Sequence, residues 1–207
     1  FAHKNGKDSV TVKNWFADKS YWLETVSFAD GTTWSAQQIS DDVGSSGNDT
    51  LVVAANSAAQ ALHGKAGNDT ITGWNGNDVL YGDAGDDVIN GGQGADKLYG
   101  GLGNDTLTTD WWGWDNTFEG GKGNDQLTGS YARDTYVFNV GDGADVITDN
   151  AAQYRNHADT DANYRDVLKF GDSIKVSDIQ LKVVGNDLVF AHKNGKDSVT
   201  VKNWFAD

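Results

Sequence analysis

The chain has 207 residues, enough for one sizeable domain or one elongated repeat domain with caps. Its net charge of −14 argues against nucleic acids and anionic membrane surfaces as partners and favours cations. Cysteine is absent, which excludes disulfides and thiolate metal sites, and no apolar run approaches the roughly 20 residues of a membrane span. No signal-peptide pattern opens the chain, and because its first residue is Phe1 we expect it to be part of a larger protein.

The acidic residues are almost all aspartate. Aspartate accounts for 28 of them, glutamate occurs only at Glu24 and Glu119, and 26 residues are glycine. Aspartate and glycine in this excess indicate tight turns, in which a short carboxylate folds back on the backbone.

The chain begins with a long duplication. Residues 1–18, FAHKNGKDSVTVKNWFAD, recur without change at 190–207, an offset of 189 residues. Either the duplication is engineered, or the chain is slightly more than one period of a tandem array; the second interpretation predicts that residues 19–34 also follow the C-terminal copy. Residues 20–34 then predict a strand and a turn, and Ser35 is a plausible cap for a helix over 35–42.

A nine-residue repeat fills the middle of the chain. Its consensus is G-G-x-G-x-D-x-(Leu/Ile)-x, and seven copies start at residues 44, 64, 73, 82, 91, 100 and 120, with weaker copies at 129 and 140. A disordered glycine-rich linker would not keep an aliphatic residue at a fixed phase. Position eight therefore predicts a strand of two or three residues with its side chain inward, at Leu51, Ile71, Leu80, Ile89, Leu98, Leu107, Leu127 and Ile147.

The first six positions of the repeat suit a hard cation. Glycine permits left-handed backbone angles that turn carbonyl groups toward one centre, and the aspartate at position six adds an anionic oxygen. Calcium takes six to eight such oxygens. One apolar residue in nine buries too little surface to fold a thin roll, so metal between the turns must supply the difference.

Two degenerate segments fix the phase of the series. If 53–63 and 109–119 are each one repeat with two inserted residues, the series has eleven members. With two repeats per coil, alternate repeats stack on one edge, and six aspartates share the first edge. These are Asp49, Asp69, Asp87, Asp105, Asp125 and Asp145. On the second edge only Asp78 and Asp96 lie in intact neighbouring turns, so we expect five calcium sites on the first edge and one on the second.

The C-terminal flank is not repetitive. Residues 149–165 indicate a loop, and strands are expected at 167–170, 179–184, 187–192 and 198–204, with hairpin turns at Gly185-Asn186 and Asn194-Gly195. We divide the chain into an N-terminal cap (1–43), a calcium-binding roll (44–148) and a loop with a C-terminal β-meander cap (149–207), because repeat proteins need closed ends. Each copy of the duplication holds half of a complete cap, which predicts weak head-to-tail self-association.

The central repeats resemble the repeats-in-toxin (RTX) hemolysin-type calcium-binding family, and the flanks, with ETVSFADGTTW and NDLVF…DSVTVKNWF, resemble the hemolysin-type calcium-binding-related region that accompanies it. The resemblance covers nearly the whole chain. It implies an all-β fold, a right-handed parallel β-roll, with type I secretion and folding on extracellular calcium. It also implies about six Ca²⁺ sites, and up to eight, built from turn carbonyls and the position-six aspartate.

The residues that match this ligand pattern lie in the turns of the intact repeats. They are Gly44, Ser46, Gly47, Asn48, Asp49, Gly64, Ala66, Gly67, Asn68, Asp69, Gly73, Asn75, Gly76, Asn77, Asp78, Gly82, Asp83, Ala84, Gly85, Asp86, Asp87, Gly91, Gly92, Gln93, Gly94, Asp96, Gly100, Gly101, Leu102, Gly103, Asn104, Asp105, Gly120, Gly121, Lys122, Gly123, Asn124, Asp125, Gly143 and Asp145. The pattern loses its second glycine at Ser45, Lys65, Trp74 and Asp83, and its fourth at Ala132.

Other chemistry is weakly represented. The four histidines are scattered, and no nucleophile triad or phosphate-binding loop occurs. Trp111, Trp112 and Trp114 form either a local mini-core or a surface that stacks on a sugar or a protein partner. The sequence therefore predicts a non-enzymatic structural module of a large secreted adhesin or toxin. The alternatives are a calcium-binding accessory module of a secreted enzyme, or carbohydrate or partner binding through the tryptophans.

Overall fold

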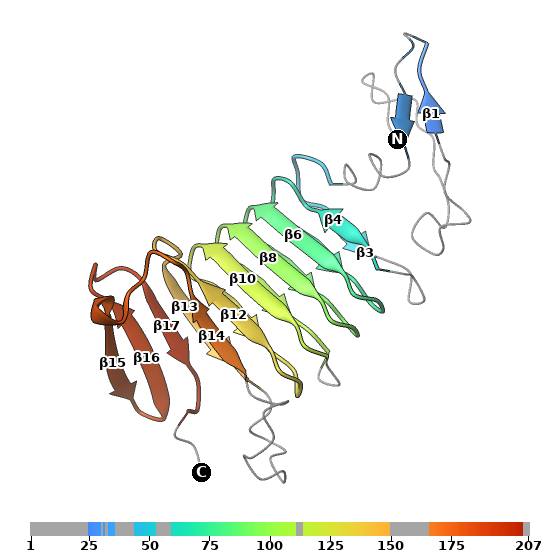
Figure 1. Cartoon of the computed structure of the whole chain (residues 1–207). Helices are drawn as coiled ribbons and strands as arrows, with labels where there is room; N and C mark the ends of the chain where they lie inside the picture. Colours follow the sequence, from blue (N-terminus) through green and yellow to red (C-terminus); the bar gives the residue numbers. More distant parts are fainter. Residues whose placement is uncertain are drawn as a thin grey trace.

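The structure, a computed structural model, describes residues 25–29, 31, 33–35, 44–52, 59–110, 114–149 and 166–204. Over these residues the chain is almost entirely β-structure, with one short 3-10 helix, η4 (Val176–Asp178). Strands of the repeat region alternate between two parallel sheets that face each other along the length of the roll (Figure 1). This arrangement confirms the predicted all-β parallel β-roll.

The larger sheet has nine strands. Their order is β15 (Ile179–Val184), β16 (Asp187–His192), β17 (Ser198–Val201), β13 (Ala144–Thr148), β11 (Gln126–Thr128), β9 (Thr106–Thr108), β7 (Val88–Asn90), β5 (Thr70–Thr72) and β3 (Thr50–Val52). From β3 to β17 every neighbouring pair is parallel, and one coil separates each pair of neighbours in the repeat region.

The smaller sheet has six strands, all parallel. Their order is β14 (Val167–Phe170), β12 (Thr135–Phe138), β10 (Thr117–Lys122), β8 (Lys97–Leu102), β6 (Val79–Ala84) and β4 (Ala61–His63). The degenerate segment 53–63 ends with β4, and the degenerate segment 109–119 ends with the first three residues of β10. Each segment therefore contributes to one strand of this sheet, as the insert hypothesis requires.

The core is a single layer between the sheets. All eight position-eight residues named above are buried, which confirms that they point inward. Five further side chains that sequence patterns did not assign to the core complete the layer: Leu62, Phe118, Tyr136, Phe138 and Val199. Aromatic residues occupy the core only outside the intact repeats, because each intact repeat leaves room for one aliphatic side chain.

Strand length differs from expectation on one sheet. Strands β6, β8 and β10 each have six residues rather than two or three, because pairing continues through the first positions of the next repeat. Asp83 pairs with Gly101, which pairs with Gly121 in turn. The smaller sheet is therefore broader than the repeat pattern alone indicates.

The C-terminal segment forms the predicted meander and also joins the roll. Strands β15, β16 and β17 are antiparallel neighbours, joined through turns that contain Gly185 and Gly195 in left-handed conformations. In addition, β17 pairs in parallel with β13, and β14 pairs in parallel with β12. Both sheets of the roll are thus continued by residues from beyond the repeats, which the sequence did not predict.

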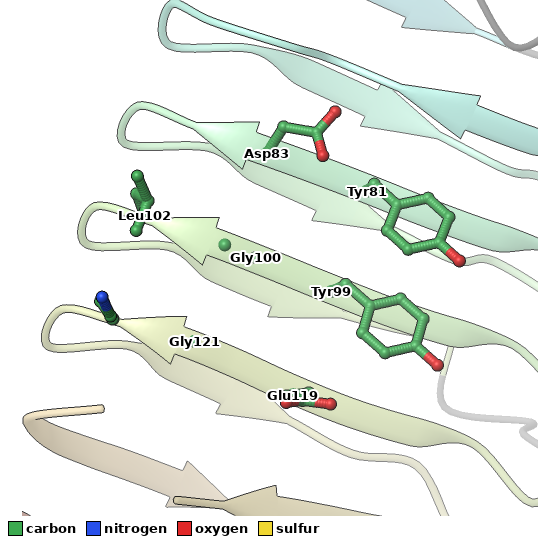
Figure 2. A pocket seen from close by; sticks show the side chains of 9 residues that line it. Tyr81, Asp83, Tyr99, Gly100, Leu102, Glu119 and Gly121 are labelled. Atoms are coloured by element: carbon green, nitrogen blue, oxygen red, sulfur yellow. The ribbon is translucent and has the colours of Figure 1, made fainter. Parts of the chain in front are cut away.

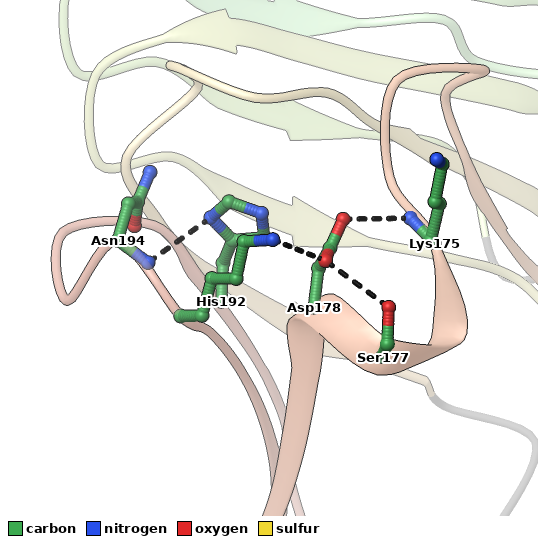
Figure 3. Close-up of polar contacts among 6 residues, drawn as sticks. Lys175, Ser177, Asp178, His192 and Asn194 are labelled. Atoms are coloured by element: carbon green, nitrogen blue, oxygen red, sulfur yellow. Dashed lines mark hydrogen bonds and ion pairs between the residues drawn. The ribbon is translucent and has the colours of Figure 1, made fainter.

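An ion pair ties the meander to η4. The ammonium group of Lys193 donates to Oδ1 of Asp178 at 2.6 Å, and the main-chain N–H of Lys175 donates to Oδ2 at 3.1 Å (Figure 3). The hydrogen bond from Lys193 lowers the pKa of Asp178 to about 2, with a smaller effect of the Lys175 N–H. This cluster fixes the turn between β16 and β17 against the start of β15.

The N-terminal segment contains a separate two-stranded antiparallel sheet, β1 (Thr25–Ser27) and β2 (Thr33–Ser35). The sequence predicted one strand and a turn here; the structure has a strand on both sides of the turn, and Ser35 ends β2. The helix expected after Ser35, the first copy of the duplication and the loop at 150–165 lie outside the described residues. In the part of the chain that the structure describes, no helix is long and apolar enough to cross a membrane.

Candidate calcium-binding site

The turns that precede the strands place position six of the repeat in two rows. The first row, before strands of the larger sheet, is Asp49, Asp69, Asp87, Asp105, Asp125 and Asp145. The second row, before strands of the smaller sheet, is Gln60, Asp78, Asp96, Asn116, Asp134 and Asp166. The structure therefore brings together the aspartates that the phase assignment placed on each edge.

From the second member of each row onward, one side-chain oxygen accepts a main-chain hydrogen bond from the row member of the preceding coil and holds the two coils in register. The main-chain N–H of Asp69 donates to Oδ1 of Asp87 at 2.7 Å, and that of Asp78 donates to Oδ1 of Asp96 at 2.9 Å. The same bond joins the other neighbours of the first row and runs along the second row from Gln60 to Asp166. Aspartate at position six thus has a structural role that does not require metal.

The second oxygen of the same carboxylates is left without a partner. Among the described residues, Oδ2 is buried and accepts no hydrogen bond at six row members. They are Asp69, Asp87, Asp105 and Asp125 of the first row and Asp78 and Asp96 of the second. A buried anionic oxygen without a partner costs several kcal/mol, at an order-of-magnitude level, unless a cation or donor compensates it.

Main-chain oxygens converge on these orphaned atoms. A Cβ added at Gly64 would lie 2.3 Å from Oδ2 of Asp69 and 2.7 Å from the carbonyl oxygen of Gly82 in the next coil. The corresponding distances at Gly73 are 2.5 Å to Oδ2 of Asp78 and 2.6 Å to the Gly91 carbonyl oxygen. Glycine at position one is required because any side chain would displace these oxygens, which are the ligand type that calcium prefers.

Position four is equally restricted. Gly85, Gly103 and Gly123 have φ angles of 140°, 126° and 149°, and an added Cβ would meet the carbonyl oxygen of the glycine one coil earlier at 1.7–2.0 Å. Position two is less strict. Lys65, Trp74 and Asp83 replace the consensus glycine there and adopt φ angles of 78°, 63° and 71°, which cost about 1–2 kcal/mol each.

The pKa values of the row aspartates are raised, as expected for buried carboxyls with no cation beside them. Burial raises the pKa of Asp78 and Asp105 to about 7, partly offset by a main-chain hydrogen bond. Burial also raises the pKa of Asp96 and Asp125 to about 6, and that of Asp145 to about 8. A neighbouring cation would favour the charged form of each carboxyl and reverse this shift.

The side chains at position five form a separate hydrogen-bond ladder on the outside of the turns. The main-chain N–H of Asp86 donates to Oδ1 of Asn68 at 3.1 Å, and that of Asn104 donates to Oδ1 of Asp86 at 2.7 Å. Asn48, Asn77 and Asn124 accept equivalent bonds. The side chains of the predicted position-five ligands are therefore used within the protein, which leaves their main-chain carbonyls as the groups that could face a cation.

The degenerate end of the second row contains residues that sequence patterns missed. Asn116 supplies the ladder oxygen, since the Asp96 N–H donates to its Oδ1 at 2.9 Å, but it carries no charge. At Asp134, Oδ2 accepts the N–H and hydroxyl of Ser130 at 2.7 and 3.2 Å. Counting the two inserted residues of 109–119 places Asn116 at position six, and the weak repeat that starts at residue 129 places Asp134 there. Neither has an orphaned oxygen, so the second row offers fewer places for a cation.

No group of three or more histidine, aspartate or glutamate side chains within the described ranges could by itself hold a metal ion. The candidate site is instead one carboxylate oxygen per turn among main-chain carbonyls. Turns with glycine at positions one and four and aspartate at position six (G-x-x-G-x-D) fit calcium on this test, because they combine a buried unpartnered carboxylate oxygen with converging hard oxygen ligands.

The outer face of the smaller sheet has a different character. The rings of His63, Tyr81 and Tyr99 stack across β4, β6 and β8, with centroids 4.2 and 4.8 Å apart. Beside Tyr99, Gly101 and Gly121 leave a shallow hollow bordered by Asp83 and Glu119 (Figure 2). Cross-strand stacking of this kind stabilises the sheet. Trp114 is exposed, whereas Trp111 and Trp112 lie outside the described residues.

Two family models match the chain. The RTX calcium-binding nonapeptide repeat (4 copies) matches residues 55–89, 75–107 and 115–147. The haemolysin-type calcium binding protein related domain matches residues 1–38 and 187–207. Together with the aspartate rows, these matches define a β-roll of calcium-binding repeats. The repeat region of this chain belongs to the RTX family of calcium-binding nonapeptide repeats.

Two solved structures show some likeness. The extracellular lipase LipA from Serratia marcescens has 17% sequence identity and a TM-score of 0.37, over 76% of this chain and 36% of the lipase. The AlgE6R3 subunit of the Azotobacter vinelandii mannuronan C5-epimerase has 17% identity and a TM-score of 0.19, over 77% of this chain and 72% of the subunit. The chain thus spans about a third of the lipase. No curated protein sequence matches it.

Proposed function

We propose that this chain is a structural module that folds when it meets extracellular calcium, after type I secretion of a large adhesin- or toxin-type protein. The observation that carries the proposal is the set of six orphaned, buried Oδ2 atoms in the two aspartate rows. Without a cation each is an uncompensated buried charge; with calcium each becomes a ligand. RTX repeats are typical of secreted proteins, which supports the location.

The proposed stoichiometry is about six calcium ions, five between turns of the first row and one between Asp78 and Asp96. Their ligands would be the position-six carboxylates and the turn carbonyls predicted above. About six ions carry about twelve positive charges, against a net charge of −14. Compaction should therefore follow binding, because neutralisation removes the repulsion between stacked turns.

We further propose the division into an N-terminal segment (1–43), the roll (44–148) and a C-terminal cap (149–207). The pairing of β17 with β13 and of β14 with β12 supports a cap that closes both sheets at one end. In a tandem array, neighbouring units would be the partners of these ends. No observation on the described residues favours an enzyme-accessory role or a glycan partner over this function.

Calcium-dependent folding is testable by far-ultraviolet circular dichroism of the full chain in millimolar calcium, in millimolar magnesium and in chelator. We expect a β spectrum with calcium alone, since magnesium needs a near-ideal octahedral site and retains water. A site occupied at a hundredfold over its dissociation constant contributes about 2.7 kcal/mol, so several sites decide the fold. Calorimetric titration should give about six ions. A β spectrum that persists in chelator would contradict the proposal.

A further inference from the structure

The two sheets of the roll end unevenly. Strand β14 is the last strand of the smaller sheet, whereas the larger sheet continues beyond β13 through β17, β16 and β15 (Figure 1). The ring of Phe170 in β14 lies 5.9 Å from that of Phe190 in β16, so β15 is the strand that reaches farthest beyond the smaller sheet. Its inner face can be covered only by other parts of this chain or by another chain.

Exposure of this inner face increases strand by strand. Val199 of β17 is 1% exposed, its register partner Phe190 of β16 is partly buried, and Leu181 of β15, opposite Phe190, is 64% exposed. The parallel row runs from Val201 through Leu188 to Val183, which is 62% exposed. The core thus continues onto a sheet face whose outer part is uncovered. We call Leu181 and Val183 of β15 the open face.

The chain itself indicates what covers the open face. Residues 190–207, which form the second half of β16 and all of β17, are identical to residues 1–18, which precede the β1–β2 hairpin. The haemolysin-type calcium binding protein related domain matches both 187–207 and 1–38. Because the two matches share the duplicated segment, they are overlapping parts of one domain, in which the hairpin follows β17.

The hairpin of β1 and β2 contains an apolar residue at a central strand position. Among the described strands, β1 and β2 pair only with each other. Val26 is the middle residue of β1 and is partly buried. The hairpin therefore offers an apolar strand position, and the open face is an apolar surface of the same domain.

We propose that the open face is a docking surface for the β1–β2 hairpin of a second copy of this chain. In a tandem array the second copy is the next unit, and the contact joins consecutive rolls end to end. Between separate molecules the same contact is head-to-tail, because the open face of one meets the hairpin of the next. The proposal rests on the proposed function only in that the roll must be folded.

Sedimentation velocity of the full chain over a concentration series in excess calcium tests the contact. We expect the average mass of the wild-type protein to rise with concentration. Leu181→Asp and Val26→Asp should each weaken association at least tenfold, since each places a charge in the apolar contact. Val184→Asp is the matched control, because Val184 is 60% exposed but lies on the other face of β15. It should associate like the wild type.

Mixing the variants distinguishes this contact from others. Leu181→Asp retains its hairpin and Val26→Asp retains its open face, so an equimolar mixture should form heterodimers although each variant alone associates at least tenfold more weakly than the wild type. A wild-type monomer at millimolar protein would overturn the proposal. Equal effects of Leu181→Asp and Val184→Asp would also overturn it. A mixture that stays monomeric would overturn it as well, because that result would indicate that β15 pairs with β15 of another molecule or that another partner covers the open face. Circular dichroism of every variant in calcium and in chelator reports separately on calcium-dependent folding.

Discussion

The main-chain N–H of Asp87 donates to Oδ1 of Asp105 at 2.8 Å, across 18 residues of sequence, while Oδ2 of Asp105 is buried with no hydrogen-bond partner. The two oxygens of one carboxylate thus have separate roles. Oδ1 holds consecutive coils in register whether or not metal is present, and Oδ2 is the atom that we assign to calcium. Substitutions that affect only one of the two oxygens separate these roles.

The first prediction compares Asp105→Asn with Asp134→Asn. Asparagine keeps an Oδ1 acceptor for the ladder at both positions. At Asp105 it removes the orphaned anionic oxygen, so calcium affinity at the adjoining sites should fall at least about tenfold. At Asp134 it removes the acceptor for Ser130, so the free energy of unfolding should fall by about 1–3 kcal/mol while the number of bound ions stays unchanged.

Calorimetric calcium titration and urea unfolding of both variants measure these two effects. In chelator, the free energy of unfolding of Asp105→Asn should be higher than that of the wild type, because the substitution removes an uncompensated buried charge. Equal loss of calcium at the two positions would show that the second row binds metal along its whole length.

A second prediction concerns the glycine column. Gly103 has a φ of 126°, and a Cβ there would lie 2.0 Å from the Gly85 carbonyl oxygen. Gly103→Ala should therefore reduce the free energy of unfolding in saturating calcium by about 3 kcal/mol or more. Gly195→Ala is the control: its φ is 71° with no atom within 4 Å, so only the left-handed backbone should cost about 1 kcal/mol. Urea unfolding of both variants decides the matter, and similar losses would argue against contact between stacked turns.

The third prediction follows from the ion pair that anchors η4. Lys193 lowers the pKa of Asp178 to about 2 from 3.8. A lowered pKa in the folded state means that this pair stabilises the fold above pH 3.8, and that its contribution disappears as pH falls through about 2. An NMR titration of the Asp178 carboxyl carbon should show this midpoint.

Lys193→Ala should move the Asp178 midpoint up toward 3.8. Lys202→Ala, which removes the separate ion pair with Asp187, should leave it in place. A wild-type midpoint near 4 would mean that the Lys193 contact is not maintained in solution.

Short-range pattern was sufficient to predict the roll and its metal chemistry. A period of nine residues with one aliphatic side chain at a fixed position predicts one short strand per repeat, and with two repeats per coil, as in the family that the repeats resemble, the position-eight core and both aspartate rows follow from the spacing. The two-residue inserts set the phase, and β4 and β10 lie where that phase requires. Glycine at positions one and four was equally predictable, since turns that aim carbonyl groups at a cation exclude side chains.

Contacts between distant segments were decided only by the tertiary structure. No periodicity links β17 to β13 or β14 to β12, because these pairs join the repeats to a non-repetitive flank. Asn116 and Asp134 look like failed calcium ligands in sequence, yet both are buried parts of the second ladder, because the neighbouring coil needs an oxygen acceptor there even without metal. The exposure of Leu181 likewise depends on the two sheets ending at different places, a property that no local pattern contains.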